Sequence, residues 1–173
     1  IKAQPVYLAF HPLRGACRIV GFPDASYKNN EDKSSQRASC IFMAEPRTDK
    51  PNTKGSLVDY ESTKIKKSVQ STTVAELYSL MKTFGTCQFL RGLWKDMTGE
   101  TAPIHIRTDA NNLVTTASTT HLPEQRETIH MINMLRHEAC SGAIEDLAHV
   151  ATVAMFADCQ TKEKAPVANL RDA

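Results

Sequence analysis

The sequence contains no long hydrophobic run, which argues against one class of protein at the outset. None of its apolar stretches approaches the roughly 18 residues that a bilayer-spanning helix needs. The opening stretch, IKAQPVYLAFHPLRG, also lacks the charged start and continuous apolar centre of a signal peptide. We therefore expect no membrane association and a protein of the soluble, intracellular type.

Neither the cysteines nor the net charge indicates a particular class of protein. The five cysteines are an odd number, are widely spaced and contain no C-x-x-C pair, which argues against a disulfide framework or a zinc ribbon. The 21 basic and 19 acidic residues nearly cancel, to a net charge of +2. This excess is too small to indicate nucleic-acid binding by itself. Any site for a polyanion must therefore be local.

Motifs of several common kinds of enzyme are also missing. The sequence has no glycine-rich phosphate loop and no G-x-S-x-G nucleophile elbow. The spacing of its six histidines matches no zinc motif, and His137 with Cys140 lacks a second pair. The sequence therefore supports neither a serine nucleophile nor a structural zinc site.

What is present fits one compact domain. A chain of 173 residues, 41% of them hydrophobic, buries about two-thirds of the surface that it exposes when unfolded. A second full domain would not fit. Because the first residue is Ile1 rather than Met, we expect an excised segment of a longer protein. We assign residues 1–16 to a connection, 17–165 to the domain and 166–173 to a C-terminal tail.

Hydrophobic periodicity predicts the order of the elements. Short apolar runs predict strands at 17–22, 39–44, 56–69, 104–109 and 143–150. Helical spacing predicts a long amphipathic helix between the cap candidates Thr72 and Thr73 and the terminal Gly99. Further helices are predicted at 110–118, 124–140 and 155–164. The order β-β-β-α-β-α-α-β-α predicts an α/β fold, with a mixed five-stranded sheet of three antiparallel strands plus two parallel ones, flanked by helices.

Four acids stand where this layout brings distant segments together: Asp24, Glu76, Asp109 and Asp158. Clustered carboxylates repel one another, so a folded chain keeps them mainly where cations neutralise them. Such ligands suit Mg²⁺ or Mn²⁺, and two ions about 4 Å apart support phosphodiester hydrolysis. Structural alternatives remain open: Glu76 fits a capping box that begins at Thr73, and Asp24 and Asp109 suit turns.

Two further groups have both a structural and a functional interpretation. Lys64, Lys66 and Lys67 form a basic run before the long helix, either as a solvated edge that discourages sheet pairing or as a contact for a phosphate backbone. Asn111 and Asn112 follow the third acid. They either form a turn or cap, or donate a hydrogen bond to a minor-groove edge or a 2′-hydroxyl.

Five blocks of the sequence, taken together, resemble a known family. GFPDASY, KSSQRASCIFM, KKSVQSTTVAELYSL, IHIRTDANNLV and HVATVAMFADCQTK are similar, in this order, to the blocks of the ribonuclease H domain of copia-type LTR retrotransposons. The resemblance covers about residues 17–164. Each motif is weak alone, and their order makes the match specific.

The resemblance implies a ribonuclease H-like fold with two Mg²⁺ ions, for which Mn²⁺ is a possible substitute. Asp24 would bridge both ions, Glu76 and Asp109 would complete one site, and Asp158 would complete the other. The implied activity is hydrolysis of the RNA strand of RNA/DNA hybrids during reverse transcription, which leaves 5′-phosphate and 3′-hydroxyl ends.

The same resemblance implies the position of the domain in a longer polyprotein and its location in the cell. Residues 1–16 would be what remains of the connection to an upstream reverse transcriptase of the same polyprotein. The loop from Glu45 to Gly55 would be a local elaboration. The implied location is intracellular, in cytoplasmic virus-like particles.

One feature departs from relatives of the family, and two other functions remain open. Cellular and retroviral ribonucleases H carry a histidine on a flexible loop before the last aspartate, whereas only VATVAMFA separates His149 from Asp158. We therefore predict that His149 is an ordinary residue at the end of the fifth strand. The rival functions are another nuclease or transposase of the same fold, like integrases and junction resolvases, and a degenerate nucleic-acid-binding scaffold. The presence of all four acids argues against the scaffold.

Overall fold

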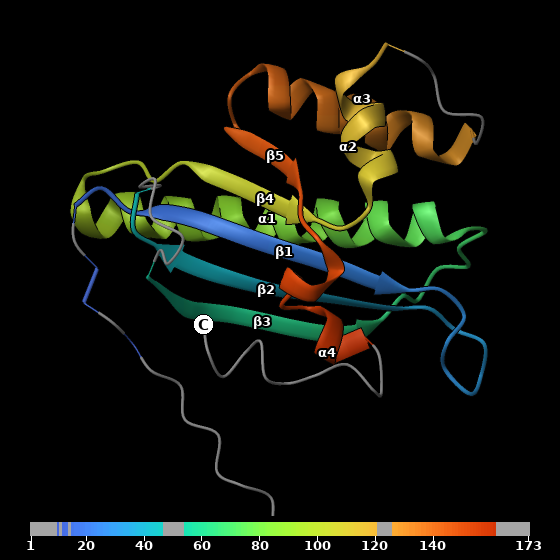
Figure 1. Ribbon diagram of the computed structural model, residues 1–173. Helices are drawn as coiled ribbons and strands as arrows, with labels where there is room; N and C mark the ends of the chain where they lie inside the picture. Colours follow the sequence, from blue (N-terminus) through green and yellow to red (C-terminus); the bar gives the residue numbers. More distant parts are fainter. Residues whose placement is uncertain (1–9, 11, 14, 47–53, 121–125, 162–173) are drawn as a thin grey trace, which may run out of the picture.

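Five strands and four α-helices make up the computed structural model (Figure 1), which describes residues 10, 12–13, 15–46, 54–120 and 126–161. The strands are β1 (Arg18–Ser26), β2 (Gln36–Ala44), β3 (Gly55–Lys64), β4 (Ile104–Thr108) and β5 (Asp146–His149). The helices are α1 (Thr72–Thr98), α2 (Asn111–Ser118), α3 (Arg126–Cys140) and α4 (Asp158–Thr161), with a 3₁₀ turn, η1 (Thr152–Ala154), before α4. The predicted order of elements is confirmed.

The strands form one mixed sheet in the order β3-β2-β1-β4-β5. β1 and β3 both pair antiparallel with β2, whereas β4 pairs parallel with β1 and with β5. The prediction of three antiparallel strands plus two parallel ones is therefore confirmed. β3 lies at an edge of the sheet, and its side chains alternate between half-buried and exposed, as expected of a strand with one wet face.

Helices cover the two faces of the sheet unequally. Figure 1 shows α1 behind the sheet and α4 in front of it. The larger core packs α1, α2 and α3 against β1 and β4 and includes Leu80, Ile106, Leu113 and Leu135. A smaller core on the other face joins β2 to the segment around Met155. Apolar residues recur at helical spacing along α1, because this helix buries the largest face of the four.

The capping of α1 differs from the prediction. Ser71, rather than Thr72 or Thr73, is the N-cap, and its hydroxyl accepts a hydrogen bond from the amide of Val74 at 3.3 Å. Val74 therefore occupies the position at which a capping box needs Glu or Gln. The capping-box alternative for Glu76 is wrong. Gly99 ends the helix in the left-handed conformation, as predicted.

The first strand is longer than predicted. β1 runs through Pro23 and Asp24 to Ser26, and it pairs with β2 along its whole length. Its ladder with β4 ends at Gly21, so Pro23 lies where that neighbour needs no amide donor. Asp24 is therefore a residue within a strand rather than a turn residue after one.

Other boundaries also shift, and some predictions lie outside the described residues. β5 is four residues long, shorter than the predicted 143–150, because the amide of Ile144 donates to Glu138 of α3 and not to the sheet. The helix predicted at 155–164 begins at Asp158, and residues 162–164 are not described. The tail at 166–173 and much of the connection at 1–16 also lie outside the described residues. Within the described part of the chain, no helix has the length and apolar character needed to cross a membrane.

Close packing of α1 on β1 predicts a stability effect at Gly21. A Cβ atom there would lie 2.9 Å from Thr83 Cγ2 and 3.1 Å from Cys87 Sγ and Ile106 Cδ1. We expect Gly21→Ala to lower the free energy of unfolding by about 1–3 kcal/mol, measured by urea titration, because α1 must move away from the sheet. Gly85→Ala is the matched control, since nothing lies within 4 Å of a Cβ there, and it should stabilise α1 by about 0.5–1 kcal/mol. Equal stabilities for Gly21→Ala and the unmodified chain would contradict this packing.

Candidate metal centre

A split in the sheet positions the candidate site. The parallel ladder between β1 and β4 ends at the pair Gly21 and Ile106. Beyond that pair the two strands are no longer bonded to each other, and each carries one acid past the split: Asp24 within β1 and Asp109 directly after β4. The carboxyl ends of parallel strands gather polar side chains in this way.

Three of the four predicted acids meet at this split. Asp24, Glu76 and Asp109 each offer a carboxylate oxygen, and these oxygens all lie within 4.8 Å of one another. Asp24 is 1% exposed and Glu76 is 9% exposed, so two of the three carboxylates are held away from bulk water. Glu76 comes from the second turn of α1 and reaches the site from the face of the sheet that α1 covers.

Two hydroxyl groups, neither of them predicted from the sequence, hold the carboxylates in place. The Thr161 hydroxyl of α4 donates to the Asp24 carboxylate, and the Thr152 hydroxyl of η1 donates to Asp109 Oδ2 at 3.2 Å. Thr161 belongs to the ADCQTK block that carries the family resemblance, and that block was the available signal. No local pattern marks Thr152, because its partner is 43 residues away in the sequence.

A side-chain bond joins the first turns of two helices beside the cluster. Asn112 Nδ2 donates to Thr73 Oγ1 at 2.8 Å, and Asn112 Oδ1 accepts from the amide of Leu113 at 2.9 Å. This bond ties the start of α2, which follows Asp109, to the start of α1, which carries Glu76. Asn111 and Asn112 are both exposed at the beginning of α2, so Asn112 has a structural contact whatever else it binds.

Asp158 stands apart from the other three acids. It is the first residue of α4, it is half-buried, and it does not belong to the group of carboxylates within 4.8 Å. The Thr161 hydroxyl, which donates to Asp24, nevertheless also lies 3.3 Å from the backbone carbonyl oxygen of Asp158. α4 thus brings the backbone of Asp158 close to the cluster, while the Asp158 carboxylate lies outside the group.

The predicted lysines lie beside the start of α1. Lys64 ends β3, and Lys66 and Lys67 follow it. All three are exposed, and Lys64 forms an ion pair with Asp32. His149 is the last residue of β5 and is exposed. The prediction that it ends the fifth strand is confirmed.

The donor set of the cluster fits a hard divalent cation. Carboxylate oxygens from three different elements converge, and neither histidine nor cysteine belongs to the group. Mg²⁺ and Mn²⁺ prefer such oxygen ligands. Two buried carboxylates also repel each other, so a bound cation would stabilise this arrangement. Asp24, Glu76 and Asp109 are the residues that would hold it.

Comparison with known sequences identifies no relative. No family model matches the chain, and no curated protein matches it. The solved structures therefore provide a comparison of the fold alone.

Three solved structures of similar fold are ribonucleases H. The N-terminal RNase H domain of Rv2228c from Mycobacterium tuberculosis has a TM-score of 0.59 at 12% identity, and the match covers 86% of this chain and 93% of that one. LC11-RNase H1, solved in complex with an RNA/DNA hybrid, has a TM-score of 0.58 at 15% identity, over 84% of this chain and 95% of that one. RNase H1 from the archaeon Halobacterium salinarum has a TM-score of 0.53 at 15% identity, over 90% and 99%. Matches that span nearly the whole of each domain confirm the expected architecture, and this chain has a ribonuclease H-like fold.

Proposed function

We propose that this chain is a metal-dependent endoribonuclease that hydrolyses the RNA strand of RNA/DNA hybrids. The observation that carries the proposal is the meeting of Asp24, Glu76 and Asp109 at the split between β1 and β4. The fold supports it, since a protein of similar fold was solved with an RNA/DNA hybrid bound. The motif order adds the context of a copia-type retrotransposon polyprotein with a reverse transcriptase upstream.

Each residue of the site has a proposed part. Asp24, Glu76 and Asp109 would hold Mg²⁺ or Mn²⁺, and Asp158 would contribute from α4 to a second ion. Two such ions, when bound, supply an activated water and stabilise the leaving oxygen of a phosphodiester. Thr161 and Thr152 hold the carboxylates of Asp24 and Asp109 in place through their hydrogen bonds.

Residues outside the cluster position the nucleic acid in this proposal. Lys64, Lys66 and Lys67 contact phosphate groups of a strand that extends beyond the duplex part, and such contacts give affinity without sequence preference. Asn111 and Asn112 contact a minor-groove edge or a 2′-hydroxyl, the group that distinguishes RNA from DNA. Both asparagines are exposed beside Asp109, as such contacts require.

A cleavage assay tests the proposal directly. The chain is incubated with end-labelled RNA/DNA hybrid, duplex RNA or duplex DNA in Mg²⁺, in Mn²⁺ or in EDTA. We expect cleavage of the RNA strand of the hybrid, with 5′-phosphate products, and no cleavage in EDTA. Comparable nicking of duplex DNA would instead indicate an integrase-like or resolvase-like nuclease. Tight hybrid binding without cleavage in either metal would indicate a degenerate scaffold.

His149 is expected to contribute little to this reaction. It pairs opposite Thr108 in the β4–β5 ladder, so its backbone is held in the sheet, and η1 begins three residues later. Positioned acid–base groups are worth about 10²–10⁴-fold. We expect His149→Ala to change the single-turnover rate by less than about tenfold in Mg²⁺ and in Mn²⁺. A loss beyond about a hundredfold with metal binding intact would make His149 a catalytic residue.

A further inference from the structure

A concave and strongly basic surface lies beside α1. It is an open pocket of about 420 Å³ lined by Arg37, Glu61, Thr63, Lys64, Ile65, Lys66, Lys67, Tyr78 and Lys82. We call it the lysine groove. Its lysines come from the end of β3, from the connection that follows and from the third turn of α1. Folding therefore brings Lys82 to a basic run from which it is 15 or more residues distant in the sequence.

Most of the positive charge in the lysine groove is available to a ligand. Glu61 is the single acid among its lining residues, and it is held by Arg37 through two hydrogen bonds of 2.7 and 3.1 Å. Lys64 pairs with Asp32, and its bond holds the pKa of that carboxyl below the usual range. Among the described residues, no acid lies within 4 Å of the ammonium groups of Lys66, Lys67 and Lys82.

The lysine groove and the acidic cluster lie on different sides of α1. Glu76 and Tyr78 are two residues apart, which places their side chains about 200° apart around a helix of 3.6 residues per turn. Tyr78 and Lys82 are four residues apart and therefore share a face. The helix itself, about 10 Å across, separates the pocket from the carboxylates.

The strands give the same separation. Ala38 pairs opposite Asp24 and packs with Ala157 in the core on the α4 side. Arg37 is its neighbour on β2, and successive side chains of a strand point to opposite faces. Arg37 therefore points to the α1 side, where Tyr78 and Lys82 complete the lysine groove.

Because of this separation, only a flexible nucleic acid can contact both the lysine groove and the acidic cluster. A duplex is stiff, with a persistence length of about 50 nm for DNA, so one seated at Asp24 and Asp109 does not bend around a single helix. A single strand is flexible enough to do so. Basic grooves with an aromatic side chain are typical of single-strand binding, and Tyr78 supplies a ring with Lys67 Nζ at 5.8 Å from its centroid.

We propose that the lysine groove binds a single-stranded extension of the nucleic acid whose duplex part occupies the acidic cluster. The extension contributes affinity through its phosphates and leaves the chemical step unchanged. The identity of the duplex rests on the proposed function, whereas single-strand binding in the lysine groove does not. The two are therefore tested separately.

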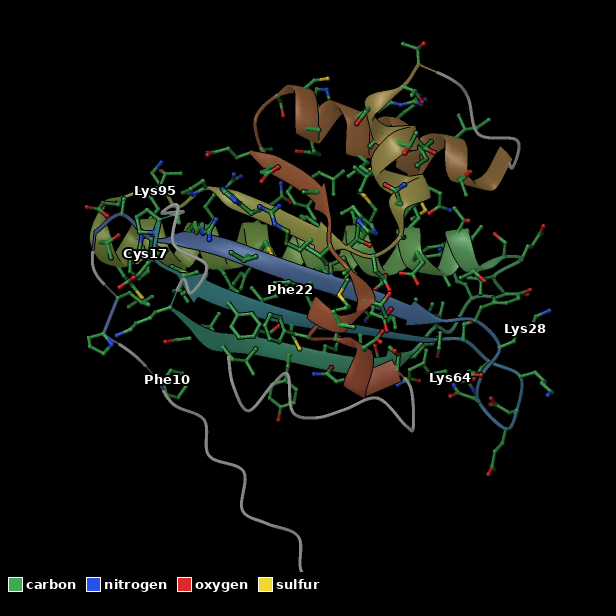
Figure 2. The ribbon with its side chains drawn as sticks, viewed as in Figure 1. Phe10, Cys17, Phe22, Lys28, Lys64 and Lys95 are labelled. Atoms are coloured by element: carbon green, nitrogen blue, oxygen red, sulfur yellow. The ribbon has the colours of Figure 1, made fainter. Side chains whose placement is uncertain are left out.

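The test measures binding in EDTA with charge-matched variants. Lys67→Glu/Lys82→Glu alters the lysine groove, and Lys54→Glu/Lys95→Glu alters two exposed lysines elsewhere. Figure 2 shows Lys95 at the end of the molecule opposite Lys64. Each double variant replaces two positive charges by two negative ones, which takes the net charge from +2 to −2. Fluorescence anisotropy follows a labelled single strand of about 12 nucleotides, a blunt RNA/DNA hybrid, and the same hybrid with a single-stranded extension.

We expect the variant of the lysine groove to bind the single strand at least about tenfold more weakly, with a salt dependence reduced by about 1–2 in log–log slope. It should lose the gain in affinity that the extension gives, while its affinity for the blunt hybrid changes by less than about threefold. The control variant should bind all three probes like the unmodified chain. Unchanged single-strand binding by the first variant, equal losses in both variants, or an equal loss for the blunt hybrid would overturn the inference.

Failure of the proposed function gives a different result. If the unmodified chain cleaves no hybrid in Mg²⁺ or Mn²⁺, the proposed nuclease activity is wrong. The binding measurements in EDTA remain valid in that case, because they need no cleavage.

Discussion

Asp24→Asn is expected to reduce hybrid cleavage by at least about a thousandfold, to background. A divalent ion contributes several kcal/mol of transition-state stabilisation, and each 1.4 kcal/mol is about tenfold in rate. Asp24 is the most buried of the three clustered acids, and an amide is a much poorer ligand for Mg²⁺ than a carboxylate. The change keeps the volume of the side chain, and the Thr161 hydroxyl, which donates to Asp24, can still donate to the amide oxygen.

The fold should survive this substitution. Removing one charge from a buried group of like charges reduces their repulsion, so the melting temperature in EDTA should stay the same or rise by a few degrees, equivalent to about 1 kcal/mol. Single-turnover cleavage and thermal unfolding are measured side by side. Asp59→Asn is the control, since Asp59 is a half-buried strand aspartate outside the cluster. Normal cleavage by Asp24→Asn would reject the site.

Glu76→Gln is expected to separate catalysis from folding. Ser71 caps α1 and Val74 stands at the capping-box position, so Glu76 has no capping role to lose. Glutamine has nearly the same shape, and we expect the free energy of unfolding to change by less than about 1 kcal/mol. Cleavage should fall by about a hundredfold or more, because the cluster loses one of its three carboxylates.

Metal binding provides a second measurement for this variant. Isothermal titration with Mn²⁺ should show weaker binding in Glu76→Gln than in the unmodified chain, because an amide oxygen carries no charge. Glu138→Gln on α3 is the matched control, a half-buried helical glutamate outside the cluster. Extensive unfolding of Glu76→Gln with normal activity of its folded fraction would show that Glu76 is structural.

The order of the elements and the candidate acids could be predicted from the amino-acid pattern alone. Periodicity is local, so apolar spacing sufficed to predict α1 as one long helix that ends at Gly99, although not its N-cap at Ser71. Alternation along residues 56–69 likewise predicted a strand with one wet face, and the structure places that strand at Gly55–Lys64. The acids stood out because each interrupts an apolar segment, and burying a charged group without compensation is costly.

Which of these residues meet could not be predicted from local patterns. Register is a long-range property, and the split of β1 from β4 after Gly21 brings Asp24, Asp109 and Glu76 together while Asp158 stays on α4, outside the group. The cap of α1 depended on backbone geometry that Ser71 and Thr72 do not distinguish by residue type.

The hydroxyl donors and the lysine groove were hidden for the same physical reason. Thr152 and Thr161 bond to carboxylates 43 and 137 residues away, and Lys82 joins the basic run through the packing of α1 against β1 and β2. Such contacts depend on the tertiary fold of the whole chain. No local pattern of polarity encodes them, because a threonine or lysine on a polar surface looks the same in sequence whether or not a partner from elsewhere arrives beside it.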